Sequence, residues 1–186
     1  MTGTEVEIVF DKACSNLVPN STLETVMYNN FKELGIPQLT DEDIEFARAI
    51  RSTLTEEDKK FRVAPELAGK DVCDIILPYT EESGKKMMFG STDVGDVSWI
   101  VPTVQVNTAC WAIGTPGHTW QVVTQGTLPM AEKAMLHAGK VMAATALEVL
   151  LYPDLVDKAK AELKERLGGE SYVCPIPSDV KPSARK

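Results

Sequence analysis

The sequence predicts an α/β fold, with a mixed or mainly parallel sheet lying between helices. Several short stretches rich in β-branched residues are typical of strands, and several longer stretches carry apolar residues at helical spacing. At 186 residues, with 44% hydrophobic and 25% charged residues, the chain is long enough for one domain with a hydrophobic core.

The first predicted elements are a strand and a helix. Residues 5–10 (Glu-Val-Glu-Ile-Val-Phe) alternate well enough for a half-buried strand. Ser21 and Glu24 have the spacing of a capping box, which predicts a helix from Ser21 to about Leu34, ended by Gly35.

A second helix is expected to start at Thr40 or Asp41 and to break near Thr55, where the capping pattern repeats. Its apolar stripe consists of Phe46, Ala49, Ile50 and Leu54.

The middle of the chain carries the other predicted strands. Residues 72–78 form a strand ended by proline, residues 86–89 a short strand, residues 103–111 a buried strand and residues 120–124 a possible one. Trp99, Trp111 and Trp120 are expected to anchor the core around the adjacent loops.

Two further helices are predicted before an extended tail. Residues 130–151 have an Ala-rich face that would let this helix pack closely on a sheet. A final amphipathic helix starts at Pro153-Asp154, runs to about Leu167 and is closed by Gly168-Gly169.

Composition excludes several classes of protein. The net charge of −8 and pI near 4.8 argue against a nucleic-acid partner. No apolar run approaches the roughly 20 residues of a membrane span, so no membrane partner is expected. The four cysteines are irregularly spaced, which favours reduced thiols and a cytoplasmic location: Cys14, Cys73, Cys110 and Cys174.

The candidate site lies in two glycine-punctuated turns that flank the predicted strand 103–111. The first turn, residues 90–99, carries Asp93 and Asp96, and the second, residues 114–119, carries His118. Loops at the ends of buried strands are where α/β proteins place their chemistry.

Each candidate also has an ordinary structural interpretation. Asp93 and Asp96 could simply stabilise a turn, with Asp96 capping a short helix at residues 97–101, or they could orient a ligand histidine. His118 could be a turn histidine bonded to backbone, and His137, within the Ala-rich helix, is expected to be a packing or surface residue.

Four segments together carry a family resemblance: residues 10–20, 90–99 and 114–120, and Cys174-Pro-Ile-Pro177. They resemble the C-terminal part of the zinc-dependent amidohydrolase, aminoacylase and carboxypeptidase family, and are most similar to its aminobenzoyl-glutamate branch. The resemblance runs from about Thr4 to Pro182, with the paired motifs in the family's order.

The resemblance implies two domains and a metal site. Residues 1–20 would be the last strand of a lid and dimerisation domain with its hinge, and residues 21–186 the C-terminal half of the catalytic domain. In the complete enzyme two zinc or manganese ions would bind. His118 would be the final metal ligand, with Asp93 or Asp96 in support. Asn20, otherwise a plain loop or cap residue, would lie at the hinge near the substrate.

The implied activity is hydrolysis of an amide bond to an amino-acid carboxylate, with an aminobenzoyl-glutamate or an acyl-amino acid as the small-molecule substrate. The family's His-x-Asp pair, bridging Asp and Glu-Glu pair, which includes the general base, are absent from this chain. The chain alone therefore lacks most metal ligands, and its beginning resembles the middle of a larger protein.

Two interpretations of that gap stay open. Either the chain needs a missing N-terminal half or a separate subunit to complete the metal site, or it is a catalytically silent fragment. A homo-oligomer is also expected, because the strand 5–10 would have an unpaired edge that could recruit a second copy.

Overall fold

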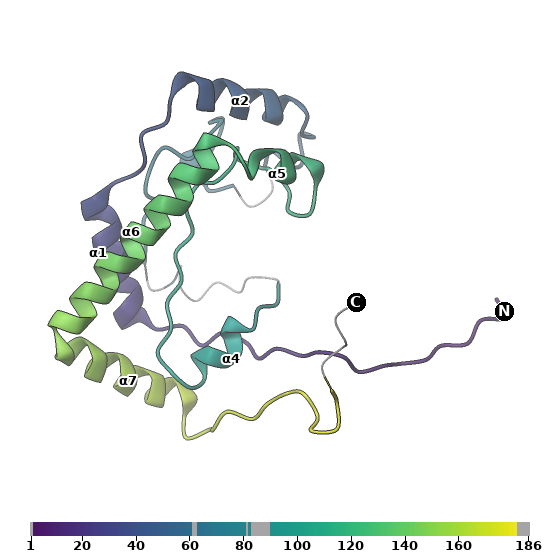
Figure 1. Ribbon diagram of the computed structural model, residues 1–186, viewed down its shortest axis with the longest axis vertical. Coiled ribbons are helices and arrows are strands. Elements are labelled where there is room, and N and C mark those ends of the chain that lie inside the picture. The colour runs from purple at the N-terminus through teal and green to yellow at the C-terminus, as the bar shows by residue number, and fades with distance from the viewer. Residues whose placement is uncertain (1, 61–62, 81, 83–89, 182–186) are drawn as a thin grey trace.

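The computed structural model describes residues 2–60, 63–80, 82 and 90–181, and throughout this part the chain is helical or irregular (Figure 1). Its elements, in chain order, are α1 (Ser21–Leu34), α2 (Asp41–Ser52), η1 (Pro65–Leu67), α4 (Val94–Ser98), α5 (Trp120–Gln125), α6 (Pro129–Leu151) and α7 (Pro153–Leu167).

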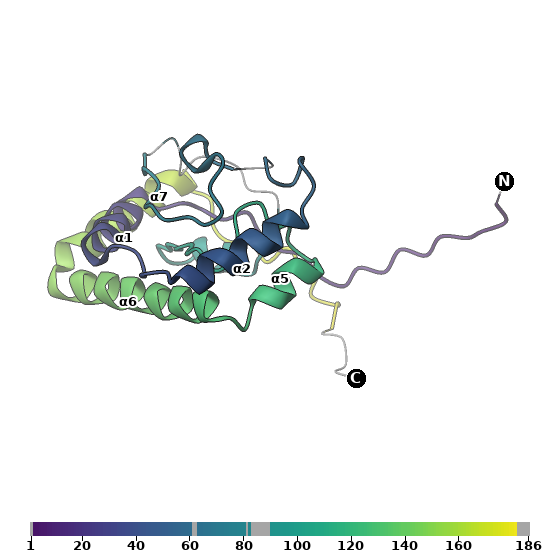
Figure 2. The same cartoon turned by 90° about the horizontal axis from the view of Figure 1, so that it is seen from above.

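Helices α1, α6 and α7 pack against one another and form what we call the helical wall. Figures 1 and 2 both show α1 and α6 side by side, with α7 turning back from the end of α6. The inner side of α6 is buried through Met130, Ala134, His137 and Val141. The small alanine at position 134 lets the neighbouring chain approach this side closely.

Polar contacts fasten the start of α1 to α7. The Glu162 carboxylate accepts hydrogen bonds from the backbone N–H groups of Ser21 (2.7 Å) and Thr22 (2.9 Å) and from the Thr22 hydroxyl (2.8 Å). The negative charge thus lies at the positive end of the α1 dipole, where it stabilises the helix.

The sequence predicts all four long helices, with one error in capping. The N-cap of α1 is Asn20, whose Oδ1 accepts from Leu23 N at 3.1 Å, and not Ser21. Gly35 ends α1 with φ 71°, as predicted. Helix α2 opens with a complete capping box between Thr40 and Asp43, the latter also paired with a lysine of α6.

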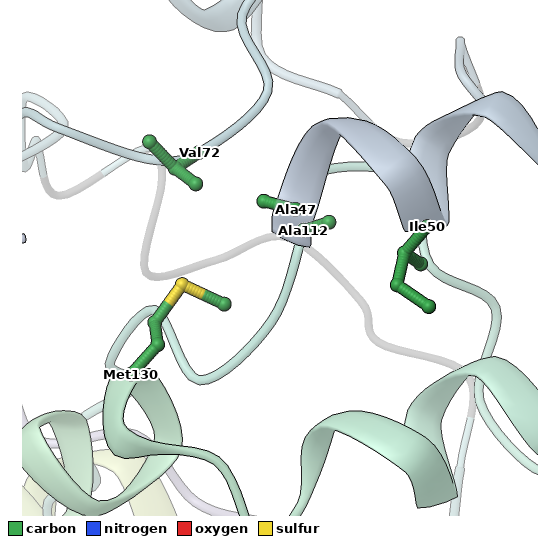
Figure 3. Close-up of a cluster of buried hydrophobic side chains, with 5 residues drawn as sticks. All are labelled: Ala47, Ile50, Val72, Ala112 and Met130. Atoms are coloured by element: carbon green, nitrogen blue, oxygen red, sulfur yellow. The ribbon is translucent and has the colours of Figure 1, made fainter. Parts of the chain in front are cut away.

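A small apolar cluster joins α2 to the start of α6. It consists of Ala47, Ile50, Val72, Ala112 and Met130, all at most 8% exposed (Figure 3). Residues 72 and 112 belong to irregular segments, so the cluster ties the start of the predicted strand 72–78 and the end of the predicted strand 103–111 to the helices.

The predicted α/β fold is wrong. The described residues contain no strand and hence no sheet, and residues 5–10, 72–78 and 103–111 are irregular. A strand needs a neighbouring strand to bond its peptide groups, and period-two alternation alone does not supply one. Near the N-terminus Val6 is 86% and Ile8 91% exposed, so these side chains are not buried against any described element.

Residues 120–124 are also not a strand, because they form α5. Here the side chain of Gln125 reaches back to the Gln121 carbonyl at 3.0 Å, and local contacts of this kind override the β-propensity of two adjacent valines. The predicted strand 86–89 lies outside the described residues.

The expectation that no apolar run approaches the length of a membrane span is wrong for α6. This helix is long and apolar enough, by length and composition, to cross a membrane. The core helix of a water-soluble protein meets the same criteria, so the finding assigns no location. Only 22% of the apolar window is buried in this structure.

The tryptophans do not anchor a core as expected. Trp111 is 44% and Trp120 58% exposed. Trp99 is half-buried, and its indole N–H donates to the Asn16 carbonyl at 2.8 Å, which ties α4 to the N-terminal segment.

Candidate functional site

His118 lies in an exposed turn directly before α5, with a backbone φ of 60°. Left-handed backbone is uncommon for any residue other than glycine, and such strained positions cluster at functional sites. The imidazole has no hydrogen-bond partner within the described part of the chain, so the interpretation as a turn histidine bonded to backbone finds no support.

The turn that carries His118 is held firmly at its base. Gln125, fully buried, accepts a hydrogen bond from Ala112 N (2.7 Å) and donates to the Thr115 hydroxyl (3.1 Å). The Arg51 guanidinium donates to the Ile113 carbonyl at 2.8 Å. These two supporting side chains escaped sequence reasoning, because a glutamine and an arginine in polar surroundings look like ordinary surface residues.

Gly114 allows the same turn to press against the α2–η1 connection. A Cβ added at this glycine would lie 2.9 Å from the Asp58 carbonyl oxygen, and its φ is +84°. Any other residue would have to displace backbone, so the sequence needs glycine here.

Asp96 is a structural clamp in this molecule. Its Oδ1 accepts from Ser15 Oγ (2.7 Å), Ser15 N (3.2 Å) and the Tyr172 hydroxyl (3.1 Å), so it joins α4 to both the N-terminal segment and the C-terminal tail. The Ser15 hydroxyl bond is the main reason that the pKa of Asp96 falls below its ordinary value.

Tyr172 completes this clamp from the tail. Loss of water around the phenol, a bond with Cys174 and the nearby Asp96 carboxylate raise the pKa of Tyr172 to about 12. The phenol therefore stays protonated and keeps donating to Asp96. Asp96 does not cap a helix at residues 97–101, because it lies inside α4 (Val94–Ser98).

Asp93 differs from Asp96, since it is exposed and occupies the N-cap position of α4 without a side-chain capping bond. Asn20, in contrast, is 1% exposed, and both ends of its amide are used. Its Oδ1 caps α1, and its Nδ2 donates to the Ala159 carbonyl of α7 at 2.9 Å.

The structure does not bring the predicted site residues together. Helix α5, next to His118, and helix α4, which contains Asp96, lie well apart in Figure 1. Among the described residues no group of three or more His, Cys, Asp or Glu side chains could hold a metal ion. The metal role of His118 therefore stays a prediction, and the described part of this chain does not fit a complete metal site.

The described structure also has a concavity away from this turn. It is a hollow of about 1110 Å³ between the helical wall and residues 103–109. Phe31, Met130 and His137 line the wall side, and Ser91 and Thr92, just before Asp93, lie at its edge. His118 does not line it.

The chain is similar over its whole length to a protein of Escherichia coli (strain K12) that is named as a subunit of p-aminobenzoyl-glutamate hydrolase, with 39% identity over 200 aligned residues. It is 30% identical to the Xaa-Arg dipeptidase of Mus musculus over 85% of this chain, and 33% identical to that of Homo sapiens over 45%. No family model and no solved structure matches.

These similarities confirm the resemblance to the amidohydrolase and peptidase family. The chain spans about two fifths of the length of its relatives, 41% of the bacterial protein and 39% of the mouse protein.

Proposed function

We propose that this chain, a relative of amidohydrolases and peptidases, is the C-terminal portion of a hydrolase that cleaves an amide bond to an amino-acid carboxylate. The substrate would be an aminobenzoyl-glutamate or an acyl-amino acid. The observation that carries the proposal is the 39% identity that spans the entire chain to a protein named for hydrolysis of p-aminobenzoyl-glutamate.

The proposal includes dependence on zinc or manganese. In this chain His118 is the candidate ligand, because its imidazole is exposed on a strained turn that Gln125 and Arg51 support. One imidazole does not make a catalytic metal site, which needs about three protein ligands. Since the described residues hold no cluster of three donors, the other ligands and the general base would come from an N-terminal half or from a separate subunit.

The alternative is that the chain is catalytically silent by itself. The same shortage of donors favours this for the isolated chain, and the two proposals differ only in what happens when a completing polypeptide is present. The bacterial relative is named as one subunit of its hydrolase, which agrees with assembly into a larger enzyme.

Location and self-association complete the proposal. The four cysteines are free, the usual state in the reducing cytoplasm, where we place the protein. A homo-oligomer would form through residues 5–10, whose apolar side chains are exposed.

The test is an assay of p-aminobenzoyl-glutamate hydrolysis with added zinc or manganese. The chain is measured alone and co-expressed with the part of the E. coli relative that does not align with it. We expect no turnover by the chain alone and turnover by the pair.

His118→Asn in the pair then isolates the imidazole, because asparagine tolerates the left-handed backbone that His118 adopts. We expect a loss of at least about 100-fold in kcat with unchanged helix content. Full activity of the Asn variant would remove His118 from the site, and turnover by the chain alone would contradict the need for a second polypeptide.

A further inference from the structure

A second concavity lies where the last turns of α7 meet the chain that follows α4 (Figure 1). It is a groove of about 330 Å³, which we call the α7 groove. Residues 99–102 form one wall. Side chains of α7 and residues 169 and 170 form the other. The residues that line it all belong to the described part of the chain.

The wall formed by residues 99–102 is apolar and yet open to water. Four apolar residues follow one another here, and Ile100 is 63% and Val101 47% exposed. The turn is fixed, because the backbone N–H groups of Ile100 and Val101 both donate to the Val97 carbonyl at 3.0 Å. Contiguous apolar side chains on an exposed, fixed turn are typical of a binding surface.

The base and the far end of the groove are ordered as well. Leu163 of α7 is 7% exposed, and the Trp99 indole is held by its bond to the Asn16 carbonyl at 2.8 Å. Just after α7, the Glu170 N–H donates to the Leu167 carbonyl at 2.8 Å. The apolar surface is therefore preformed, and a ligand does not have to order it.

Two lysines give the groove a positive rim. Lys160 and Lys164 are exposed and lie four residues apart, so they share one face of α7. Neither forms an ion pair within the described structure, whereas Arg166 of the same helix is paired with Glu162 at 2.8 Å. Like charges at this spacing repel each other. An anion bound between the two lysines would remove this repulsion.

The arrangement limits the ligand to one negative group. Lys160 and Lys164 come before Leu167 along α7, and Glu170 follows the end of the helix, so the cations and the carboxylate lie toward opposite ends of the groove. A second negative charge on the ligand would meet Glu170. The volume lies at the lower end of the about 300–1,000 Å³ that small-molecule pockets enclose.

We propose that the α7 groove binds a small amphipathic carboxylate. The carboxylate lies between Lys160 and Lys164, and the apolar body packs against residues 99–102 and Leu163. The groove does not include His118, and the argument for it uses neither the hydrolytic activity nor the metal. The site therefore goes beyond the proposed function and does not depend on it.

The test titrates the full chain with octanoate and follows the indole N–H signal of Trp99 by nuclear magnetic resonance. Trp99→Phe identifies that signal by its loss. Acetate carries the charge without the apolar body, and 1-octanol carries the apolar body without the charge. We expect octanoate to shift the Trp99 signal and to bind at least about tenfold more tightly than either.

A pair of double variants isolates the lysines. Lys160→Gln with Lys164→Gln removes both charges of the rim. Lys140→Gln with Lys158→Gln is the matched control, because it changes the net charge equally at two exposed lysines that do not line the groove. We expect the first pair to weaken octanoate binding at least about fivefold and the second to leave it unchanged. Circular dichroism establishes that both remain folded.

Four results would overturn the proposal. They are no binding of octanoate, equal binding of octanoate and 1-octanol, unchanged binding after loss of Lys160 and Lys164, and binding that leaves the Trp99 signal in place. The last would put the ligand elsewhere, for example in the hollow. Because no arm of this experiment measures hydrolysis, failure of the proposed function would leave each of these results unaffected.

Discussion

The helical wall and the extended segment 104–109 differ in where their hydrogen bonds go. Several polar groups of the wall are paired within it: Glu162 accepts from the first N–H groups of α1, and Asn30 donates to Glu148 of α6 at 2.6 Å, whereas His137 Nε2 has no partner among the described residues. Residues 104–109 take part in no backbone–backbone hydrogen bond among the described residues, and the Thr108 carbonyl accepts only a weak bond from the Cys110 thiol, at 3.5 Å. Helices bond their own backbone, so they form wherever one apolar face is covered, whereas an extended segment depends on a neighbour.

The difference predicts that mutations in the two regions have unequal effects on stability. The largest loss is expected for Asn20→Ala. The substitution removes the N-cap of α1 and the bond that ties it to the Ala159 carbonyl of α7, so it should lower the free energy of unfolding by about 3 kcal/mol.

Asn107→Ala is the matched control in the extended segment, where the side chain is exposed. We expect it to change the free energy of unfolding by less than about 0.5 kcal/mol. Urea denaturation of Asn20→Ala and Asn107→Ala measures both changes in the free energy of unfolding. Similar losses would mean that the extended segment is as firmly integrated as the wall.

Glu162→Gln should cost somewhat less, about 2 kcal/mol at neutral pH, because the amide keeps one acceptor but loses the charge. Burial tends to raise the pKa of Glu162, yet bonds from Thr22, Ser21 and Arg166 outweigh this and lower it from 4.5 to about 2. Glu165→Gln, on the same helix but exposed, is expected to be nearly silent.

The sign of the pH dependence follows from that shift. The unfolded chain takes up the Glu162 proton at a higher pH than the folded chain, so the stabilisation is complete above pH 4.5 and is lost as the pH falls toward 2. The stability difference between the wild type and Glu162→Gln should therefore shrink across this window. A difference that stays constant from neutral pH to pH 2 would refute the assigned role of the carboxylate.

The same contrast explains which predictions from the sequence succeed. The helices follow from local patterns, such as the capping box of Thr40 and Asp43 and the glycine that ends α1, and they are found where expected. The strands fail because alternation predicts only that a segment could pair. Nothing in residues 103–111 specifies a partner, and the structure provides none among its described residues.

In the candidate site too, features set by local sequence could be predicted, whereas features set by distant contacts could not. The second turn could be recognised from the sequence by its glycines, of which Gly114 is required by its backbone geometry. The Asp96 clamp could not, because its donors Ser15 and Tyr172 lie 81 and 76 residues away. Contacts at such separation depend on the tertiary fold. The predicted α/β fold was wrong, so it could not bring these residues together.

The smallest expected loss of stability tests whether the N-terminal segment around Ser15 is held against α4. A Cβ at Gly95 in α4 would lie 2.1 Å from the Ser15 carbonyl oxygen, so Gly95→Ala must push the two segments apart. We expect a loss of about 1 kcal/mol and faster exchange of the Ser15 and Val18 amides, which bond to Asp96 and Ser98.

Gly139→Ala is the matched control, because a Cβ at this position in α6 meets no atom within 4 Å. Alanine is the better helix former, so this substitution should stabilise the chain by about 0.5–1 kcal/mol. The two glycine substitutions are thus expected to have opposite signs in the same denaturation experiment. If Gly95→Ala were also stabilising, the N-terminal segment would not be held against α4, and the hydrogen bonds of Asp96 to Ser15 would not fix its position.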